Sequence, residues 1–366
     1  MRYLHGLNVL RILASVVVFY DHSRGWFAFG GQRWYVDETL TDTVLGPLHL
    51  DALVGAFGIA TFFVVSGLVI TYSAHRESPG RFLARRAVRI LPVLWVVLLA
   101  VWFLTRAGIP VGVFERVDTG DLFANLTLAN FFLSGHPGLD LVTWTLVVQI
   151  AYYLFVAATI PLLRRWPWLP PALAVALVAV LLSVAADEST TATHMVRVVI
   201  TFLPILFIGQ LIGLVQLGVL HPFAGVAYGV CQWLLLVRAD LTSDLTPAIP
   251  GYGQMVVCIA LLVIVCARLT GRLVAGRWTR GVANRTYAVF LVHVPVLYVT
   301  PHLLSTTTGT TMAFFVAIAG TAVVADLLYR LVEAPAARWY RRWENRGQDS
   351  AERAPDDLAG RAEATR

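Results

Sequence analysis

Apolar stretches recur along the whole chain and alternate with polar segments. A transmembrane helix needs roughly 20 predominantly apolar residues, and ten stretches come close to that length. They centre near residues 15, 63, 98, 152, 179, 206, 229, 260, 292 and 322. The pattern predicts an all-α, polytopic membrane protein with about ten transmembrane helices.

Two polar interruptions are longer than the others, at residues 23–51 and 107–139. If the N-terminus is cytoplasmic, alternate crossings place both of them on the outer side. The arginines support this orientation, because cytoplasmic loops carry an excess of basic residues. Segments assigned to the inner side hold nineteen arginines and those assigned to the outer side hold six. We therefore predict that both termini are cytoplasmic.

The composition agrees with a membrane location. Hydrophobic residues make up 58% of the 366 residues and charged residues 14%, and the mean hydropathy is +0.71; these values exclude an ordinary soluble domain. The net charge is +6. Because most arginines flank apolar stretches, they indicate membrane orientation and not a nucleic-acid partner. We predict a multi-pass protein of the plasma or inner membrane.

One membrane-embedded domain is predicted over residues 1–343. Residues 344–366 are rich in small and charged residues, so we expect a disordered cytoplasmic tail. The start of the chain resembles a signal peptide, but Asn8 and Arg11 interrupt the apolar stretch, and we expect an uncleaved first helix. The three cysteines have neither metal nor disulfide spacing, so we predict no metal site.

The first apolar stretch carries Arg11 at its start and His22 just past its end. Eleven residues are close to three helical turns, so both side chains leave the same face, about 16 Å apart along the axis. A charged group within an apolar stretch costs at least ~2.5–3.5 kcal/mol, so it usually faces the bundle interior. The alternative is that Arg11 reaches back to the cytoplasmic headgroups and His22 lies in the opposite interface.

A second basic group precedes the third stretch. Arg86 and Arg89 are three residues apart and therefore share a helix face at the predicted cytoplasmic boundary. One guanidinium group can bind two phosphate oxygens at once, which suits a ligand with several phosphates. The alternative is that both arginines only anchor the helix at the membrane surface.

Further polar side chains lie within or beside later stretches, where each needs a partner or water. The candidate pocket-lining residues among them are Ser66, Trp144, Gln149, Tyr153, His293 and Glu333. Each also has a structural explanation: Ser66 and its neighbour Gly67 suit close helix packing, and Glu333 could pair with Arg330 three residues earlier. We expect His136 and Asp140, in the second long interruption, to lie on the surface.

In their order along the chain, these motifs resemble the acyltransferase-3 family of integral membrane O-acyltransferases. The family's arginine and histidine with ten residues between them correspond to Arg11 and His22, and its Arg-x-x-Arg to Arg86 and Arg89. The remaining matches are Phe-Phe-x-x-Ser-Gly at 62–67, His-x-Pro at 293–295 and Glu-x-Pro at 333–335. Two positions depart from the family pattern: Asn8-Val9 stands in place of Asp-Gly, and Gln149 in place of a glutamate.

The resemblance implies transfer of an acyl group, typically acetyl, from acyl-coenzyme A to a hydroxyl of a carbohydrate or a glycosylated secondary metabolite. Acyl-coenzyme A would be a co-substrate and not a bound cofactor. Arg86 and Arg89 would bind the donor, and His22 would remove the proton from the acceptor hydroxyl or carry the acyl group transiently. Arg11 would bind the donor, orient the histidine or offset oxyanion charge.

Two other functions stay open from the sequence. Intramembrane arginine and histidine also build proton and substrate paths in transporters, so an exporter of a glycan or small molecule is the main alternative. The chain shows no internal repeat of the kind that many transporters have. A catalytically inactive scaffold is the third possible function, because Gln149 lacks a carboxylate. The sequence gives no signal for an oligomeric state.

Overall fold

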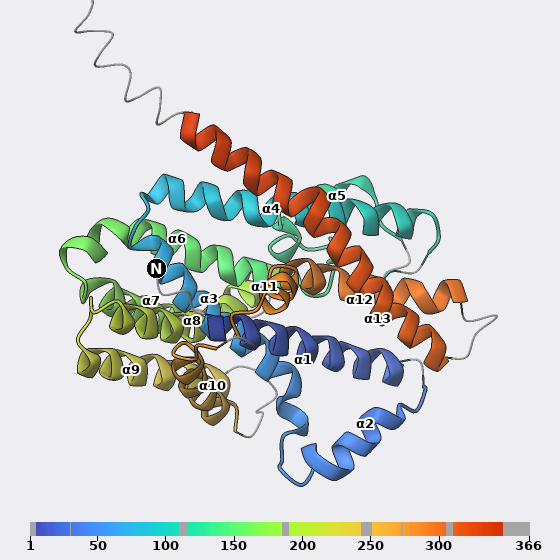
Figure 1. The fold of residues 1–366 in the computed structure, drawn as a ribbon, viewed down its shortest axis with the longest axis horizontal. Helices are drawn as coiled ribbons and strands as arrows, with labels where there is room; N and C mark the ends of the chain where they lie inside the picture. Colours follow the sequence, from blue (N-terminus) through green and yellow to red (C-terminus); the bar gives the residue numbers. More distant parts are fainter. Residues whose placement is uncertain are drawn as a thin grey trace, which may run out of the picture.

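The computed structural model describes residues 5–29, 31–109, 111, 116–184, 190–242, 251–271, 274–304 and 310–346. Within these ranges the regular structure is entirely helical, which confirms the all-α prediction (Figure 1). The helices are α1 (His5–Phe29), α2 (Tyr35–Leu40), α3 (Val54–Ala74), α4 (Pro79–Arg106), α5 (Thr119–Leu126), α6 (Trp144–Arg165), α7 (Leu169–Val184), α8 (Thr191–Gln216), α9 (Pro222–Leu241), α10 (Tyr252–Cys266), α11 (Arg277–Ala283), α12 (Thr286–Leu304) and α13 (Thr310–Leu328).

Each of the ten predicted stretches falls on one of these helices. Seven helices in the described ranges are long and apolar enough to cross a membrane: α3, α4, α6, α8, α9, α12 and the C-terminal helix over 312–346. α7 and α10 are apolar but shorter. α1 has 25 residues but is outside the set of seven, because its charged and polar side chains lower its hydropathy. The three further crossings that the sequence predicts therefore stay a prediction.

The centre of the bundle is the contact between α3 and α8. A Cβ added to Gly67 on α3 would come within 2.0 Å of the Leu206 carbonyl oxygen, and one added to Gly209 on α8 within 2.1 Å of the Val64 carbonyl oxygen. Glycine is required at both positions because the two backbones approach too closely for any side chain. Close helix packing is thus the role of Gly67, as its position in an apolar stretch indicated.

The two longer polar connections lie toward the same end of the bundle, with α2 and α5 on the right in Figure 1. The opposite end holds the start of α4. There Glu344, in the C-terminal helix, forms ion pairs with Arg81 and Arg85. The C-terminal helix continues through residue 346, and the rest of the predicted tail lies outside the described residues.

This arrangement leads to a topology prediction. Reporter fusions should place Arg366 in the cytoplasm and the α4–α5 connection outside, because arginines favour the cytoplasmic side. A fluorescent protein should therefore be active only after Arg366, and a phosphatase only in the α4–α5 connection. Paired phosphatase and fluorescent-protein fusions measure both positions, and a fusion after Arg165 serves as an inner-side control. Finding the C-terminal and α4–α5 reporters on the same side would contradict the ten-crossing arrangement.

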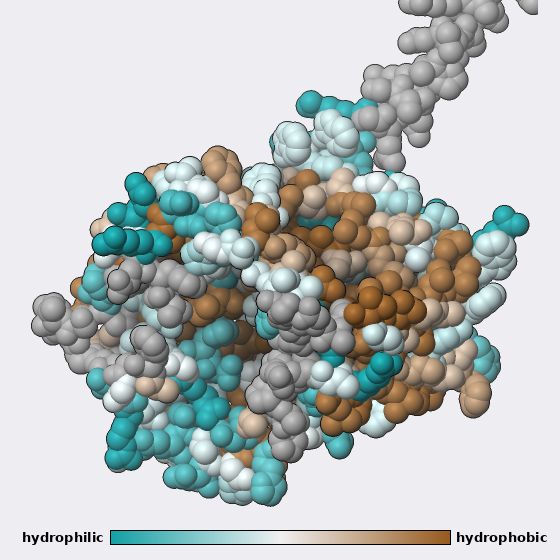
Figure 2. All heavy atoms as spheres, turned by 180° about the vertical axis from the view of Figure 1, so that it is seen from behind, coloured by the Kyte–Doolittle hydropathy of each residue, from teal (hydrophilic) through white to brown (hydrophobic). Residues whose placement is uncertain are grey.

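The surface also fits a lipid environment. Hydrophobic residues cover a broad contiguous area of the face shown in Figure 2, and large apolar side chains such as Val180, Val226 and Leu261 are more than half exposed. Soluble proteins rarely expose apolar patches of that extent. The exposed apolar area and the seven long apolar helices support a multi-pass membrane protein.

Candidate active site

A cavity of about 110 Å³ lies among α1, α3, α4, α6 and α12. Most of its wall is apolar, with Phe62, Phe63 and Phe290 among the larger side chains. The polar and charged residues that line it are Arg11, Ser66, Arg86, Arg89, Thr145, Gln149, Tyr153, Thr286 and Tyr287. Six of the ten sequence-predicted site residues therefore meet in one place, although they come from four different helices.

Arg11 enters the cavity from α1. Its Nη2 donates a hydrogen bond to Thr286 Oγ1 at 3.0 Å, and Thr286 Oγ1 in turn donates to the Ala283 carbonyl at 2.9 Å. Arg11 also interacts electrostatically with Arg89, Glu333 and Tyr153. Arg11 thus faces the bundle interior, and the alternative in which it reaches out to the headgroups is wrong.

Arg86 and Arg89 share one face of α4, as their spacing predicted, and both line the cavity. Arg86 is held by two neighbours: its Nη2 donates to Ser73 Oγ at 2.7 Å, and its guanidinium carbon lies 5.5 Å from the centre of the Phe82 ring. Arg89 makes no hydrogen bond or ion pair within the described part of the chain. Its guanidinium is therefore the cavity's most available donor group for an anionic ligand.

Ser66, Gln149 and Tyr153 also line the cavity. Tyr153 donates its hydroxyl hydrogen to Gln149 Oε1 at 3.2 Å, one helical turn away on α6. The amide group of Gln149 keeps its two N–H donors. At this position the chain therefore offers neutral hydrogen-bond donors where the family pattern has a carboxylate.

His22 and His293 lie together outside this cavity. Their ring centres are 5.0 Å apart and the rings meet edge to face. Nδ1 of His293 lies 2.8 Å from the Phe290 carbonyl oxygen, so it must carry the hydrogen, and buried Nε2, without a described partner, is left as an acceptor. Phe290 lines the cavity and its ring centre is 6.0 Å from that of His293, so this side chain contacts both the cavity and the histidine pair.

The remaining two candidates occupy other places. Trp144 packs against Phe202 with ring centres 5.0 Å apart. Glu333 is buried and interacts electrostatically with Arg89 and Arg11. The expected pair between Glu333 and Arg330 is wrong, because Arg330 Nε binds Asp326 at 2.8 Å. A π-helical turn over Tyr329–Glu333 directs Glu333 into the bundle.

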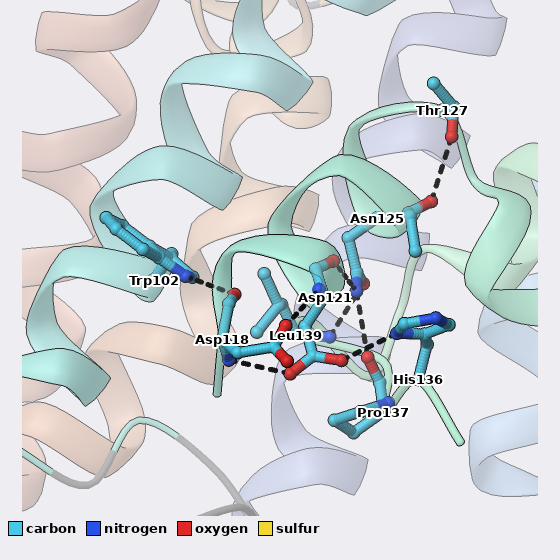
Figure 3. Close-up of polar contacts among 9 residues, drawn as sticks. Trp102, Asp118, Asp121, Asn125, Thr127, His136, Pro137 and Leu139 are labelled. Atoms are coloured by element: carbon cyan, nitrogen blue, oxygen red, sulfur yellow. Dashed lines mark hydrogen bonds and ion pairs between the residues drawn. The ribbon is translucent and has the colours of Figure 1, made fainter. Parts of the chain in front are cut away.

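The expected surface position holds for His136, which is partly exposed, but not for Asp140. Figure 3 shows the contacts of His136. His136 Nδ1 lies 2.8 Å from Asp121 Oδ1, and Asp121 also accepts a 2.8 Å bond from the Asp118 backbone N–H in the cap of α5. Burial works against ionisation of Asp121, yet these hydrogen bonds outweigh it and hold its pKa below the usual value. Asp140 is 2% exposed, so its expected surface position is wrong.

Asp140 leads to a prediction about pH. Burial raises its pKa to about 8, although the Val142 N–H opposes the shift, whereas an unfolded aspartate has a pKa of ~3.9. The folded protein therefore binds an extra proton between these values, and stability should fall as pH rises from about 4 to 8. Between pH 6 and pH 9, the thermal unfolding temperature in detergent should fall less for Asp140→Asn than for wild type.

The exposed Asp42 provides a matched control for this measurement. Asp42→Asn should lose as much stability as wild type between the two pH values. If Asp140→Asn also followed wild type, the buried carboxyl would not be the group that titrates.

Residues that the sequence did not single out complete the cavity wall. Thr286 anchors Arg11, and Tyr287 donates its hydroxyl hydrogen to the Ile90 carbonyl at 3.0 Å. Both precede the His-x-Pro segment on the same helix, and their polar type inside an apolar stretch was the available signal. No group of three or more histidine, cysteine or acidic residues in the described ranges has a metal-site arrangement.

Comparison with known proteins identifies the family of the chain. The profile of the acyltransferase-3 family, described as "Acyltransferase domain", matches residues 4–330. Nodulation protein 10 of Rhizobium leguminosarum bv. viciae is 23% identical, and the match covers 91% of this chain and 93% of that protein. The exopolysaccharide production protein ExoZ of Rhizobium meliloti (strain 1021) is 28% identical, over 84% and 95%.

A third relative is acyltransferase MdmB of Streptomyces mycarofaciens, with 26% identity over 92% of each chain. No solved structure shows a significant match. The family match covers almost every helix that carries a candidate residue and supports an enzyme over a transporter. The chain therefore belongs to the acyltransferase-3 family of membrane O-acyltransferases.

Proposed function

We propose that this protein transfers an acyl group, acetyl in the simplest case, from acyl-coenzyme A to a hydroxyl of a carbohydrate or glycosylated acceptor. The observation that carries the proposal is the meeting of Arg11, Arg86 and Arg89 in one cavity beside the His22–His293 pair. The name of one relative refers to exopolysaccharide production, which supports a carbohydrate acceptor.

The arginines suit the donor because coenzyme A carries several phosphates. Three guanidinium groups face the cavity, and the nearby carboxylates of Glu333 and Glu77 offset only part of their charge. The cavity is much smaller than the roughly 300–1,000 Å³ pockets that enclose whole drug-sized ligands. It therefore suits the narrow pantetheine arm, with the phosphates of the nucleotide end against Arg89 and Arg86.

The histidines suit the acceptor. His22 would accept the proton of the attacking hydroxyl as its oxygen bonds to the thioester carbonyl carbon. The tetrahedral intermediate would then expel the coenzyme A thiolate, which takes the proton back from His22. His293 Nδ1 donates to the Phe290 carbonyl, and a neutral His293 therefore has Nε2 as an acceptor. In that form it would add no positive charge beside His22 and would leave His22 free to become protonated.

Phe290 would separate the donor side from the acceptor side. Its ring lines the cavity and has its centre 6.0 Å from that of His293, and Phe62 packs against it with ring centres 5.9 Å apart. Reaction would require the Phe290 side chain to rotate so that the thioester reaches His22. This arrangement keeps water from the thioester until an acceptor is present.

The experiment is donor turnover by the purified full-length protein in lipid nanodiscs. Acetyl-, butyryl- and palmitoyl-coenzyme A would each be offered with a panel of oligosaccharides and glycosylated small molecules, and free coenzyme A measured with a thiol reagent. We expect acceptor-dependent release and an acceptor heavier by one acyl group in mass spectrometry. If acyl-coenzyme A bound the protein but was not consumed with any acceptor, the proposed reaction would be wrong.

A further inference from the structure

A second hollow in the molecule is an apolar groove of about 480 Å³ among α8, α9 and α10. It shares no lining residue with the arginine cavity. One face of α9 forms its wall, with Pro222, Gly225, Val226, Gly229, Val230 and Trp233 in register. These positions follow the helical repeat, so the groove runs along the α9 axis.

Glycine makes the groove wide enough for a ligand. A Cβ added to Gly225 would come within 2.4 Å of a Val215 side-chain carbon, so α9 and α8 are in close contact at that level. One turn further on, a Cβ added to Gly229 would meet nothing within 4 Å. The space at Gly229 is therefore open, and a larger side chain would fill it.

The polar groups of the groove gather at one end. Gln216 is the last residue of α8, and Arg268 follows the end of α10. Gln216 accepts a hydrogen bond from the Tyr72 hydroxyl at 3.2 Å, which leaves its N–H donors. Arg268 is exposed and forms no ion pair with any carboxylate in the described ranges. The deep end at Trp233 offers no donor, because its indole N–H binds the Gly253 carbonyl at 2.9 Å.

The length of the groove matches one leaflet. Pro222 and Trp233 are eleven residues apart, which corresponds to about 16 Å along a helix, and half of a typical hydrocarbon core is ~15 Å. In the predicted topology the end with Arg268 faces the cytoplasm. An elongated apolar slot with a guanidinium at the headgroup level complements a lipid that has an anionic head.

We propose that this groove binds an anionic phospholipid, with one acyl chain along α9 and the phosphate against Arg268. A guanidinium holds a phosphate through paired charge-assisted hydrogen bonds. The chain fills the space beside Gly229 and contacts Val226 and Trp233. The site is separate from the cavity that we assign to the acyl donor, so the two proposals succeed or fail independently.

Native mass spectrometry of the full-length protein tests the proposal. The protein would be freed of bound lipid in detergent and titrated with phosphatidylglycerol and with phosphatidylcholine of identical chains. We expect one lipid adduct that favours phosphatidylglycerol. Arg268→Gln should weaken phosphatidylglycerol binding at least tenfold, because the charge-assisted hydrogen bonds to the phosphate are lost. It should weaken phosphatidylcholine binding less, because the choline charge offsets the attraction of Arg268 for the phosphate that both lipids carry. Gly229→Leu should weaken both lipids.

The controls separate this site from ordinary lipid around the protein. Arg238 lies at the other end of α9 and contacts Ser183, so Arg238→Gln should change neither lipid. Leucine is a better helix former than glycine and meets open space at 229, so Gly229→Leu should fold. Equal retention of both lipids in wild type and Arg268→Gln would mean surrounding lipid only. A co-purified adduct with the mass of a polyprenyl phosphate would overturn the phospholipid assignment.

Discussion

Replacing His22 by alanine should lower turnover by about 100-fold or more while leaving the binding of acyl-coenzyme A nearly unchanged. Proton removal by a side chain accelerates such reactions by roughly 10²–10⁴-fold, and the proposed donor arginines line a cavity that does not include His22. A loss in turnover with preserved donor binding is the signature of an interaction made only in the transition state. Single-turnover kinetics and donor titration by calorimetry measure the two quantities separately.

His22→Gln should be as inactive as His22→Ala, because an amide can hydrogen-bond but cannot take the proton. The wild-type rate should rise with pH through the ionisation of one histidine, and both variants should lack this rise. Asp21→Asn is the matched control and should lower turnover much less than His22→Ala. The Asp21 carboxylate packs against the α3 backbone at Gly55. A folded His22→Ala protein with wild-type turnover would remove the catalytic role and make His293 the next candidate.

The sequence predicted the helical class and six of the polar residues that line the cavity, because these inferences follow from local patterns. Hydrophobic length gave the helices, and the three-residue spacing of Arg86 and Arg89 placed both on one face of α4. The free-energy cost of placing the Arg11 charge in lipid predicted that its side chain faces the bundle interior, where it binds Thr286. Each of these inferences depends on residues within one helix or on a single side chain's energetics.

What the sequence could not predict depends on contacts between distant segments. Arg330 pairs with Asp326 and not with Glu333, because a π-helical turn changes the register after Leu328. Asp140 is buried because the loop before α6 folds inward, and that depends on tertiary packing. The position of the histidines outside the arginine cavity is likewise invisible in the spacing, since Arg11 and His22 lie on the same helix.

The structure also changes the expected roles within the arginine pair. Arg86 already has a hydrogen-bond partner in Ser73 and a ring partner in Phe82, whereas Arg89 has neither. A ligand phosphate therefore competes with existing contacts at Arg86 but not at Arg89. The sequence treated the two as equivalent, and the structure makes Arg89 the stronger candidate for direct donor contact.

Arg89→Ala should raise the KM for acyl-coenzyme A about 10- to 100-fold, because a charged hydrogen bond contributes ~1.5–3 kcal/mol. Arg86→Ala should have a smaller effect, and Arg89→Lys should recover only part of the loss, since a point charge keeps the attraction but not the paired geometry. Steady-state kinetics at saturating acceptor, together with donor binding by calorimetry, measure these effects.

Arg85→Ala is the control for charge alone. Arg85 lies next to Arg86 on α4 but pairs with Glu77 and Glu344 at 2.7 Å and does not line the cavity. Its loss removes the same charge from the same end of the bundle, so long-range attraction falls equally. If Arg85→Ala and Arg89→Ala raised the donor KM to the same extent, Arg89 would act through the general field of the helix end. An effect confined to Arg89 and, more weakly, Arg86 requires direct contact with the phosphates.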